Sequence, residues 1–111
     1  MRAYQLACEL LEHAWTDAEM LQHHRITEKV AGQLYAAVAS SGANLGEGYS
    51  RSTGRDRARI FEYALGSTRE SMTWYESARH VLASRTVQER LENSKTSAGF
   101  CSLQFPASVT H

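Results

Sequence analysis

The sequence predicts an all-α protein folded as an antiparallel up-and-down four-helix bundle. Apolar residues recur every three or four positions through long segments, and no stretch of useful length alternates between apolar and polar residues as a strand does. The chain has 111 residues and one proline, Pro106, so no proline interrupts these segments. This length suits a single core. Long helices joined by short turns fold most simply as neighbours that run up and down.

Apolar stripes place the first two helices. The first stripe, within residues 4–21, is followed by QHHR at 22–25, which we expect to form a turn. The second stripe begins at Ile26 and becomes polar toward Ser41 and Asn44. The sequence SRSTG at 50–54 has the composition of a turn and is expected to end the second helix.

The third helix is predicted over residues 55–83, where two adjacent apolar stripes include Ile60 and Phe61. The fourth helix is weaker, because Val87 and Leu91 are the only large apolar residues between 84 and 95. The remaining sequence has no helical period. We therefore expect a bundle over residues 1–95 with a short or atypical fourth helix, followed by an irregular C-terminal tail over 96–111.

Charge and cysteine content narrow the functional classes. Lys plus Arg and Asp plus Glu both number 12, so the net charge is zero and gives no long-range attraction to nucleic acid. Cys8 and Cys101 are far apart and lack the spacing of metal ligands. The sequence contains neither a membrane-length apolar run nor a signal-peptide pattern. We expect a cytoplasmic protein with no membrane partner.

The stretch SSGANLGEGYSR at 40–51 carries three glycines within a predicted helix. Their spacing fits neither a dinucleotide fingerprint nor a phosphate loop, and no strand precedes them. We interpret these glycines, and one on the third helix, as close-packing positions where a missing side chain lets another helix approach. The close-packing set is Gly42, Gly46, Gly48 and Gly66. Gly48 is also a candidate helix terminator.

Polar residues of the same stretch share a helix face, because they are spaced by four, three and four positions. With two residues of the third helix, the polar set is Ser40, Asn44, Glu47, Arg51, Ser67 and Glu70. Two interpretations remain open: a hydrogen-bonded network that fixes helix register, or a buried site with two carboxylates. The Glu-x-x-His pairs of di-iron bundles are missing. The sequence therefore predicts no metal, no cofactor and no catalytic residue, and we expect a protein that is not an enzyme.

Four arginines, Arg51, Arg55, Arg57 and Arg59, lie within nine residues at a predicted turn and helix start. They form either a nucleic-acid contact through phosphate groups or a solvated helix face. No aromatic residue is interleaved among them, which favours the solvated face.

Two segments resemble a known family. QLYAAVASSGANLGEGYSR at 33–51 resembles the second helix of the bacterial four-helix-bundle proteins related to the 23S rRNA intervening-sequence protein, and RIFEYALGSTRE at 59–70 resembles part of their third helix. The matching positions are Gln33, Leu34, Ala37, Ser40, Asn44, Glu47, Gly48, Arg51, Arg59, Ala64, Gly66, Ser67 and Glu70. The family's helix-two arginine is replaced here by Ala36, and residues 86–111 do not resemble the family's apolar fourth helix.

The resemblance implies a left-handed bundle that assembles as a ring-like homopentamer, together with RNA or ribonucleoprotein partners. No catalytic activity is implied. Two functions follow as hypotheses. The first is a non-enzymatic oligomeric scaffold or adaptor that docks a protein or ribonucleoprotein partner. The alternative is direct binding of RNA or DNA through the arginines at 51–59.

Overall fold

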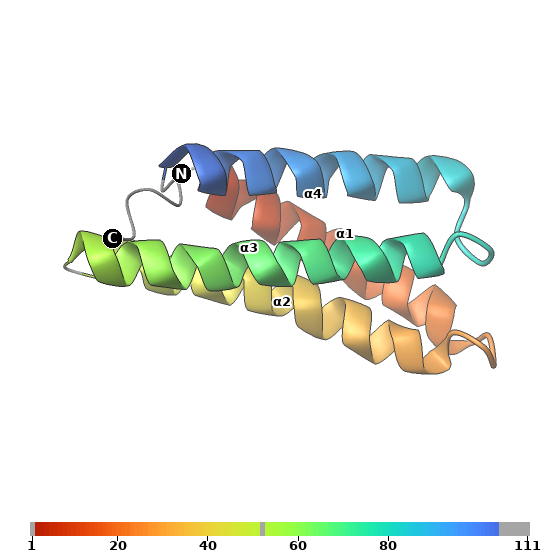
Figure 1. The fold of residues 1–111 in the computed structure, drawn as a ribbon. Helices are drawn as coiled ribbons and strands as arrows, with labels where there is room; N and C mark the ends of the chain where they lie inside the picture. The colour runs from red at the N-terminus through yellow and green to blue at the C-terminus, as the bar shows by residue number, and fades with distance from the viewer. Residues whose placement is uncertain (1, 52, 105–111) are drawn as a thin grey trace.

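Four helices make up the described chain, α1 (Arg2–Gln22), α2 (Glu28–Ser50), α3 (Gly54–Ser77) and α4 (Ser84–Gln104) (Figure 1). The computed structural model describes residues 2–51 and 53–104, with side chains through residue 99. Within these residues there is no strand, and the predicted all-α bundle is confirmed.

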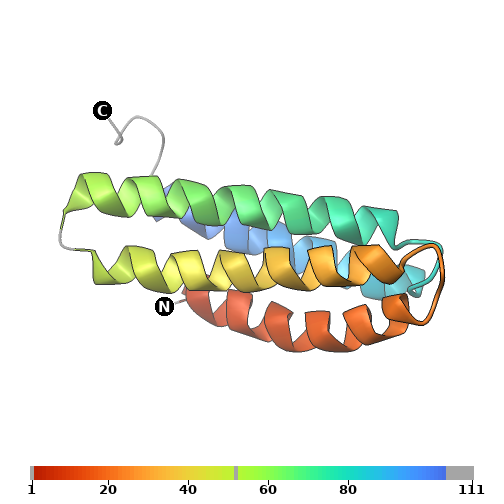
Figure 2. The same ribbon diagram turned by 90° about the horizontal axis from the view of Figure 1, so that it is seen from below.

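Each helix packs against the helix before it, and α1 also packs against α4 (Figures 1 and 2). Short connections at residues 23–27, 51–53 and 78–83 make consecutive helices antiparallel. The molecule measures 45 × 21 × 20 Å along its principal axes. The predicted turns at 22–25 and 50–54 therefore lie at the ends of α1 and α2.

Two threonines fix the helix ends at the turns. The Thr53 hydroxyl accepts a hydrogen bond from the backbone N–H of Asp56 at 3.2 Å, and so caps the first turn of α3. The Asp56 carboxylate also lies in that turn, where the helix dipole favours negative charge. The buried Thr27 hydroxyl donates to the Leu21 carbonyl at 2.8 Å, which ties the start of α2 to the end of α1.

The third helix is shorter than predicted, because α3 ends at Ser77 and not at residue 83. Residues 78–83 form a turn, and their apolar residues Ala78 and Leu82 are buried in it. The Leu82 N–H donates to the Ala78 carbonyl at 3.0 Å within this turn. Periodicity does not distinguish a last helical turn from a loop that folds back onto the core.

The fourth helix continues beyond residue 95, where the sequence predicted that the irregular tail begins. α4 has 21 residues, as many as α1, and is helical through Gln104, so the helix is not short and residues 96–104 are not irregular. Its inward-facing positions include Ser94 and Ser97, both buried, and such small polar side chains leave a weak apolar stripe. The predicted tail at 105–111 lies outside the described residues.

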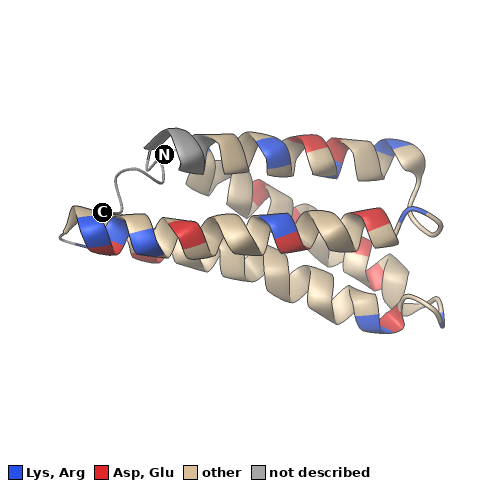
Figure 3. Cartoon of the chain, in the orientation of Figure 1, with Lys and Arg blue, Asp and Glu red and all other residues tan. Residues whose placement is uncertain are grey.

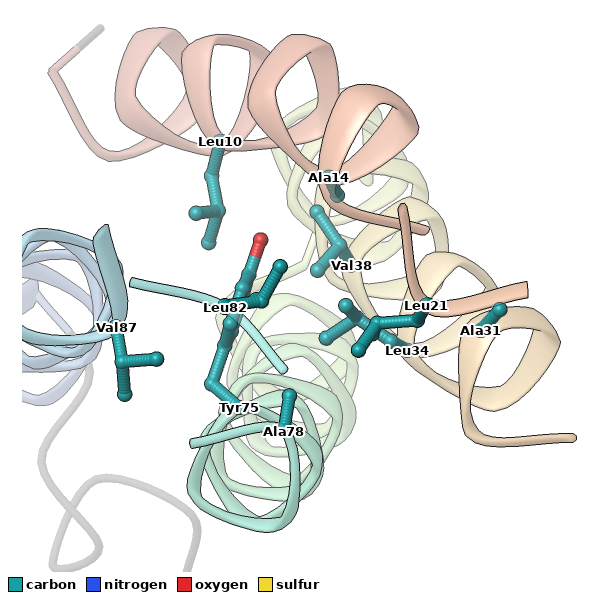
Figure 4. Packing of buried hydrophobic residues seen from close by; sticks show 10 residues of the cluster. All are labelled: Leu10, Ala14, Leu21, Ala31, Leu34, Val38, Tyr75, Ala78, Leu82 and Val87. Carbon is teal, nitrogen blue, oxygen red and sulfur yellow. The ribbon is translucent and has the colours of Figure 1, made fainter. Parts of the chain in front are cut away.

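The apolar core is divided into two clusters along the bundle. The larger one, drawn in Figure 4, consists of Leu10, Ala14, Leu21, Ala31, Leu34, Val38, Tyr75, Ala78, Leu82 and Val87. The smaller one, toward the N-terminal end of α1, consists of Ala3, Ala7, Leu45, Phe61 and Ala64. Alanine supplies much of both clusters, so the helices approach closely but bury little apolar area per residue.

Buried hydroxyl groups lie between the two clusters along α2 and α3. Ser41 and Thr68 place their hydroxyl oxygens 2.6 Å apart, and the Thr68 hydroxyl donates to the Ala64 carbonyl at 2.9 Å. Thr68 has one hydroxyl proton, so Ser41 must be the donor to Thr68. Ser71 donates to the Thr68 carbonyl at 2.7 Å. This layer satisfies polar groups that burial would otherwise leave unpaired.

The four predicted close-packing glycines differ in what surrounds them. A Cβ atom added at Gly48 would lie 2.7 Å from a ring carbon of Phe61, so this glycine is required for close approach. The nearest atoms to an added Cβ at Gly42 and Gly46 are ordinary contacts at 3.8 and 3.4 Å. Gly66 has open space beside it, so the close-packing prediction is wrong there. Gly48 also lies within α2, which continues to Ser50, and does not end the helix.

Replacing Gly48 by alanine is expected to destabilise the protein. Overpacking against the buried Phe61 ring costs about 1–3 kcal/mol, which outweighs the gain of about 0.8–1 kcal/mol from helix propensity. The matched control is Gly66→Ala, which gains the same propensity without a clash and should stabilise. Urea unfolding of both variants measures the difference. Equal shifts of the two midpoints in the same direction would contradict this account.

Candidate interaction surface

Three residues of the predicted polar set meet between α2 and α3. The Ser40 and Ser67 hydroxyl oxygens are 3.0 Å apart, and the Asn44 side-chain amide donates to the Ser40 oxygen at 3.3 Å. These contacts lie at the exposed edge of the α2–α3 contact, above the buried Ser41–Thr68 pair. Both pairs join the same two helices with the same separation in sequence. Their position suits a role in helix register.

The two carboxylates of the predicted polar set do not form a common site. Glu47 pairs at 2.6 Å with Arg51, which follows the last residue of α2, and both side chains are roughly half exposed. Glu70 instead accepts a hydrogen bond from the indole N–H of Trp74 at 3.3 Å. Among the described residues, no group of three or more histidine, cysteine, aspartate or glutamate side chains is arranged to hold a metal ion.

A buried ionic network, which the sequence analysis missed, joins three helices. Asp17 of α1 is 2% exposed and accepts hydrogen bonds from the Tyr75 hydroxyl of α3 and the Arg90 Nε of α4, each at 2.7 Å. The other Asp17 oxygen lies 3.5 Å from a terminal nitrogen of Arg90. Figure 4 shows the Tyr75 side chain crossing the core from α3. A buried carboxylate is tolerated here because charged and neutral donors satisfy it.

The network perturbs the titration of its two donors. Burial and the hydrogen bond to Asp17 raise the pKa of the Tyr75 hydroxyl far above its ordinary value. Burial acts to lower the pKa of Arg90, but the hydrogen bond and charge of Asp17 outweigh burial and raise it. Both groups therefore remain protonated throughout the physiological range, and the network is a fixed structural element.

Three of the four arginines in the predicted cluster contact groups close to them in the sequence. Arg51 pairs with Glu47, while the Arg57 Nε donates to the Arg51 carbonyl at 2.7 Å and so closes the α2–α3 turn. Arg59 lies 4.0 Å from the Asp56 carboxylate. Arg55 is exposed and enters none of the ion pairs found among the described residues.

Two hollows lie on the outer surface between α1 and α2, and we call the seam that they share the α1–α2 groove. At one end it is hollow, with a volume of about 360 Å³, and is lined by Tyr4, Cys8, Leu11, Ala39, Gly42 and Gly46. At the other end is an aromatic pair: Trp15 and Tyr35 meet edge to face, with ring centroids 5.5 Å apart. Trp15 is 58% exposed. Trp15 and Tyr35 also line, with Ala18 and Gly32, a second hollow of about 200 Å³, so both ends of the seam are hollow.

The α2 side of this groove is uncharged except at one end, where Glu47 lines the larger hollow. Residues 30–46 contain no charged residue, and α2 is accordingly uncoloured between its two ends in Figure 3. Gly32, Ala36, Ala43 and Gly46 are exposed on this stretch. Exposed helix faces in globular proteins normally carry charged and polar side chains. A long neutral face of small residues beside exposed aromatic rings is typical of an interaction surface.

No helix formed by residues 2–51 and 53–104 combines the length and the continuous apolar character needed to cross a lipid bilayer.

The comparisons with known proteins identify a similar fold but no similar sequence. No protein-family model matches the sequence, and no curated protein matches it. The structure is similar to the crystal structure of a protein of unknown function from the S23 ribosomal protein family of Bacteroides thetaiotaomicron, with a TM-score of 0.86. The match covers 95% of this chain and 99% of that chain at 14% identity. At this identity the similarity establishes a shared four-helix fold, and the resemblance to 23S rRNA intervening-sequence proteins stays a prediction.

Replacing Tyr75 by phenylalanine tests the buried network. At pH 7 the free energy of unfolding of the variant should fall by about 1.5–3 kcal/mol, the value of a hydrogen bond to a charged group. The folded-state pKa of Tyr75 is raised, so its stabilisation is complete below the unfolded-state pKa of about 10 and declines above it. The free-energy difference between wild type and Tyr75→Phe should therefore shrink by about 1.4 kcal/mol per pH unit above pH 10.

Chemical denaturation between pH 7 and pH 11 measures this difference. The control at pH 7 is Tyr63→Phe, which removes a hydroxyl from a ring that is 54% exposed and should cost far less. A pH-independent difference between wild type and Tyr75→Phe would contradict the proposed origin of the stabilisation.

Proposed function

We propose that this chain is a non-enzymatic helical scaffold that associates with itself and, in that form, docks a protein or ribonucleoprotein partner. The observation that carries the proposal is the α1–α2 groove, where exposed aromatic rings lie beside a neutral face of small residues. Such a surface has little reason to persist in a chain that works alone, because contiguous exposed apolar patches mark interaction sites.

The composition of the core supports the same proposal. The buried side chains include many alanines and several serines, so each chain removes little apolar area from water by folding alone. Association that buries further apolar surface would stabilise the folded state by mass action. The pairing of Glu47 with Arg51, and of Glu70 with Trp74, supports structural roles for these residues.

Light scattering coupled to size-exclusion chromatography, at protein concentrations from 1 to about 100 μM, tests self-association. The expected result is a molar mass that is a multiple of the 12.4 kDa chain. The resemblance to the intervening-sequence family predicts five subunits, and any stable count above one supports the scaffold. A monomer across the whole concentration range would overturn the proposal.

A second candidate function is direct binding of RNA or DNA, and the exposure of Arg55 at the first turn of α3 favours it. An arginine that is free of carboxylate partners can contact a phosphate without first losing an ion pair. Repetition of such a weak contact in an oligomer would raise avidity.

Filter binding to a mixed-sequence RNA at two salt concentrations tests this second candidate. If it is correct, binding should weaken steeply with salt, and Arg55→Ala should reduce it further. The matched variant is Arg85→Ala, which removes an exposed arginine at the start of α4 and should have little effect. If neither variant loses RNA binding, or if the wild-type protein binds no RNA at low salt, the Arg55 surface is not a nucleic-acid-binding site.

A further inference from the structure

We propose that self-association is head-to-tail, with the outer face of α3 in one copy packed into the larger hollow of the α1–α2 groove in the next copy. The inference rests on the proposed self-association, and it adds the two faces that meet and the parallel orientation of the two bundles. Three features of the described residues support it: the unequal division of charge along the chain, the chemistry of the two faces and their matching height in the bundle.

Charge is divided unequally between the two halves of the chain. Residues 1–50, which include α1 and α2, contain three Lys or Arg residues and six Asp or Glu residues. Residues 51–111 contain nine Lys or Arg residues and six Asp or Glu residues. Pairing the first half with the same half of another copy would bring like charges together. A contact between the α1–α2 groove of one copy and α3 of the next brings opposite charges together.

The larger hollow combines an apolar lining with carboxylates at its edge. Its lining consists of small and apolar residues together with Glu47, whose side chain is about half exposed. Glu12 lies one helical turn after Cys8, a lining residue, and enters none of the ion pairs found among the described residues. Residues 3–24 contain no Lys or Arg. This surface therefore suits an aromatic side chain that is accompanied by a cation.

The outer face of α3 offers both groups. Tyr63 is 54% exposed, and Arg69 is exposed and forms no ion pair with a described residue. Gly66 lies three positions from each of them, so the three residues adjoin on the helix surface. A Cβ atom added at Gly66 would meet no atom within 4 Å. An aromatic ring and a guanidinium group thus flank an uncovered stretch of α3.

The two faces lie at the same height along the bundle. Ser41 lies beside Thr68 in the contact between the antiparallel helices α2 and α3. Positions 42–46, which border the larger hollow, are therefore level with positions 63–67. Copies that are related by rotation about an axis parallel to the bundle share one height. Such a rotation brings Tyr63 of one copy level with the hollow of the next.

Glu12 and Arg69 also lie at similar heights. The helices α1 and α3 run in the same direction, and the Tyr75 hydroxyl donates to Asp17. Asp17 follows Glu12 by five positions, and Tyr75 follows Arg69 by six. The heights of Glu12 and Arg69 therefore agree to within about one helical turn, or about 5 Å. In the proposed contact, the guanidinium of one copy comes within reach of the carboxylate of the next.

Two different faces meet in this contact, so each copy can use both at once. Each helix packs mainly against its two neighbours, and the outer face of α3 points away from the α1–α2 groove (Figures 1 and 2). A head-to-tail contact of this kind closes into a ring when its rotation closes. It is compatible with the five-subunit ring that the family resemblance implies.

The first experiment reverses the charges of the proposed pair. Glu12→Arg and Arg69→Glu should each weaken self-association at least about tenfold, because each places like charges together. The two substitutions in one chain should recover most of the lost affinity. The matched control is Glu92→Arg, at an exposed position of α4, which should leave association unchanged. Analytical ultracentrifugation measures association, and circular dichroism verifies folding. Failure of the combined variant to recover affinity would overturn the proposed contact.

The aromatic contact is tested separately. Tyr63→Ala should weaken self-association at least about tenfold, since truncating a buried aromatic anchor removes a large part of an interface. Tyr63→Phe keeps the ring and should retain most of the affinity. An unchanged affinity in Tyr63→Ala would show that this face of α3 is not in the contact.

A cross-link distinguishes a head-to-tail contact from a two-fold one. In chains carrying Cys8→Ser and Cys101→Ser, Gly66→Cys is introduced into one preparation and Ala43→Cys into another. The two positions are level and lie on the two proposed faces, where Cα atoms can reach the 4.4–6.8 Å that a disulfide requires. Mild oxidation should cross-link the two chains when they are refolded together, and neither chain to itself. Cross-linking within a single preparation would indicate a two-fold contact and overturn the inference.

The outcomes distinguish this inference from the proposed function. A chain that remains monomeric overturns both. A stable oligomer that is insensitive to Tyr63→Ala and forms no mixed cross-link leaves the scaffold proposal standing and overturns the contact between α3 and the groove. The groove is then available to a different protein partner.

Discussion

The bundle depends on one buried carboxylate. Asp17 is nearly inaccessible to water, and Tyr75 and Arg90 satisfy it from two other helices. A charge in this position is tolerated only if both partners are present, so α1, α3 and α4 must meet in one register. This directional constraint matters more here than in a core rich in leucine, because alanines and serines fill much of the interior and would allow the helices to slide. Thr68 applies the same constraint between α2 and α3 through Ser41.

Small residues of α2 occur both in the core and on the outer surface of the bundle. On the inner side of α2, Gly48 admits the Phe61 ring. On the outer side, Gly32 and Gly46 leave a neutral face that, among the residues the structure describes, contacts only the edge of α1. One helix thus presents small residues to two opposite sides, and within residues 2–51 and 53–104 only the inner side is covered.

Local patterns predicted much of the fold and part of the candidate site. The stripes and turn residues placed the ends of α1 and α2, because an amphipathic helix needs only neighbours three and four positions apart to define its face. The same reasoning failed at the end of α3, where Leu82 is buried from a turn, and in α4, where the buried Ser94 contributes no apolar signal. The sequence placed Ser40 and Ser67 in one polar set without predicting that they pair, and it did not predict the partner of Glu70.

By itself, the sequence determined the class of fold, the positions of the first two turns and the neutral character of α2, because each depends on residues that are close together in the chain. Only the tertiary structure decided which polar residues are paired. Tyr75 lies 58 positions after Asp17 in the sequence, and Arg90 lies 73 positions after it. No periodicity in the sequence links these three residues. The α1–α2 groove likewise exists only when two helices lie side by side. Contacts between distant residues arise from packing, which a one-dimensional pattern does not encode.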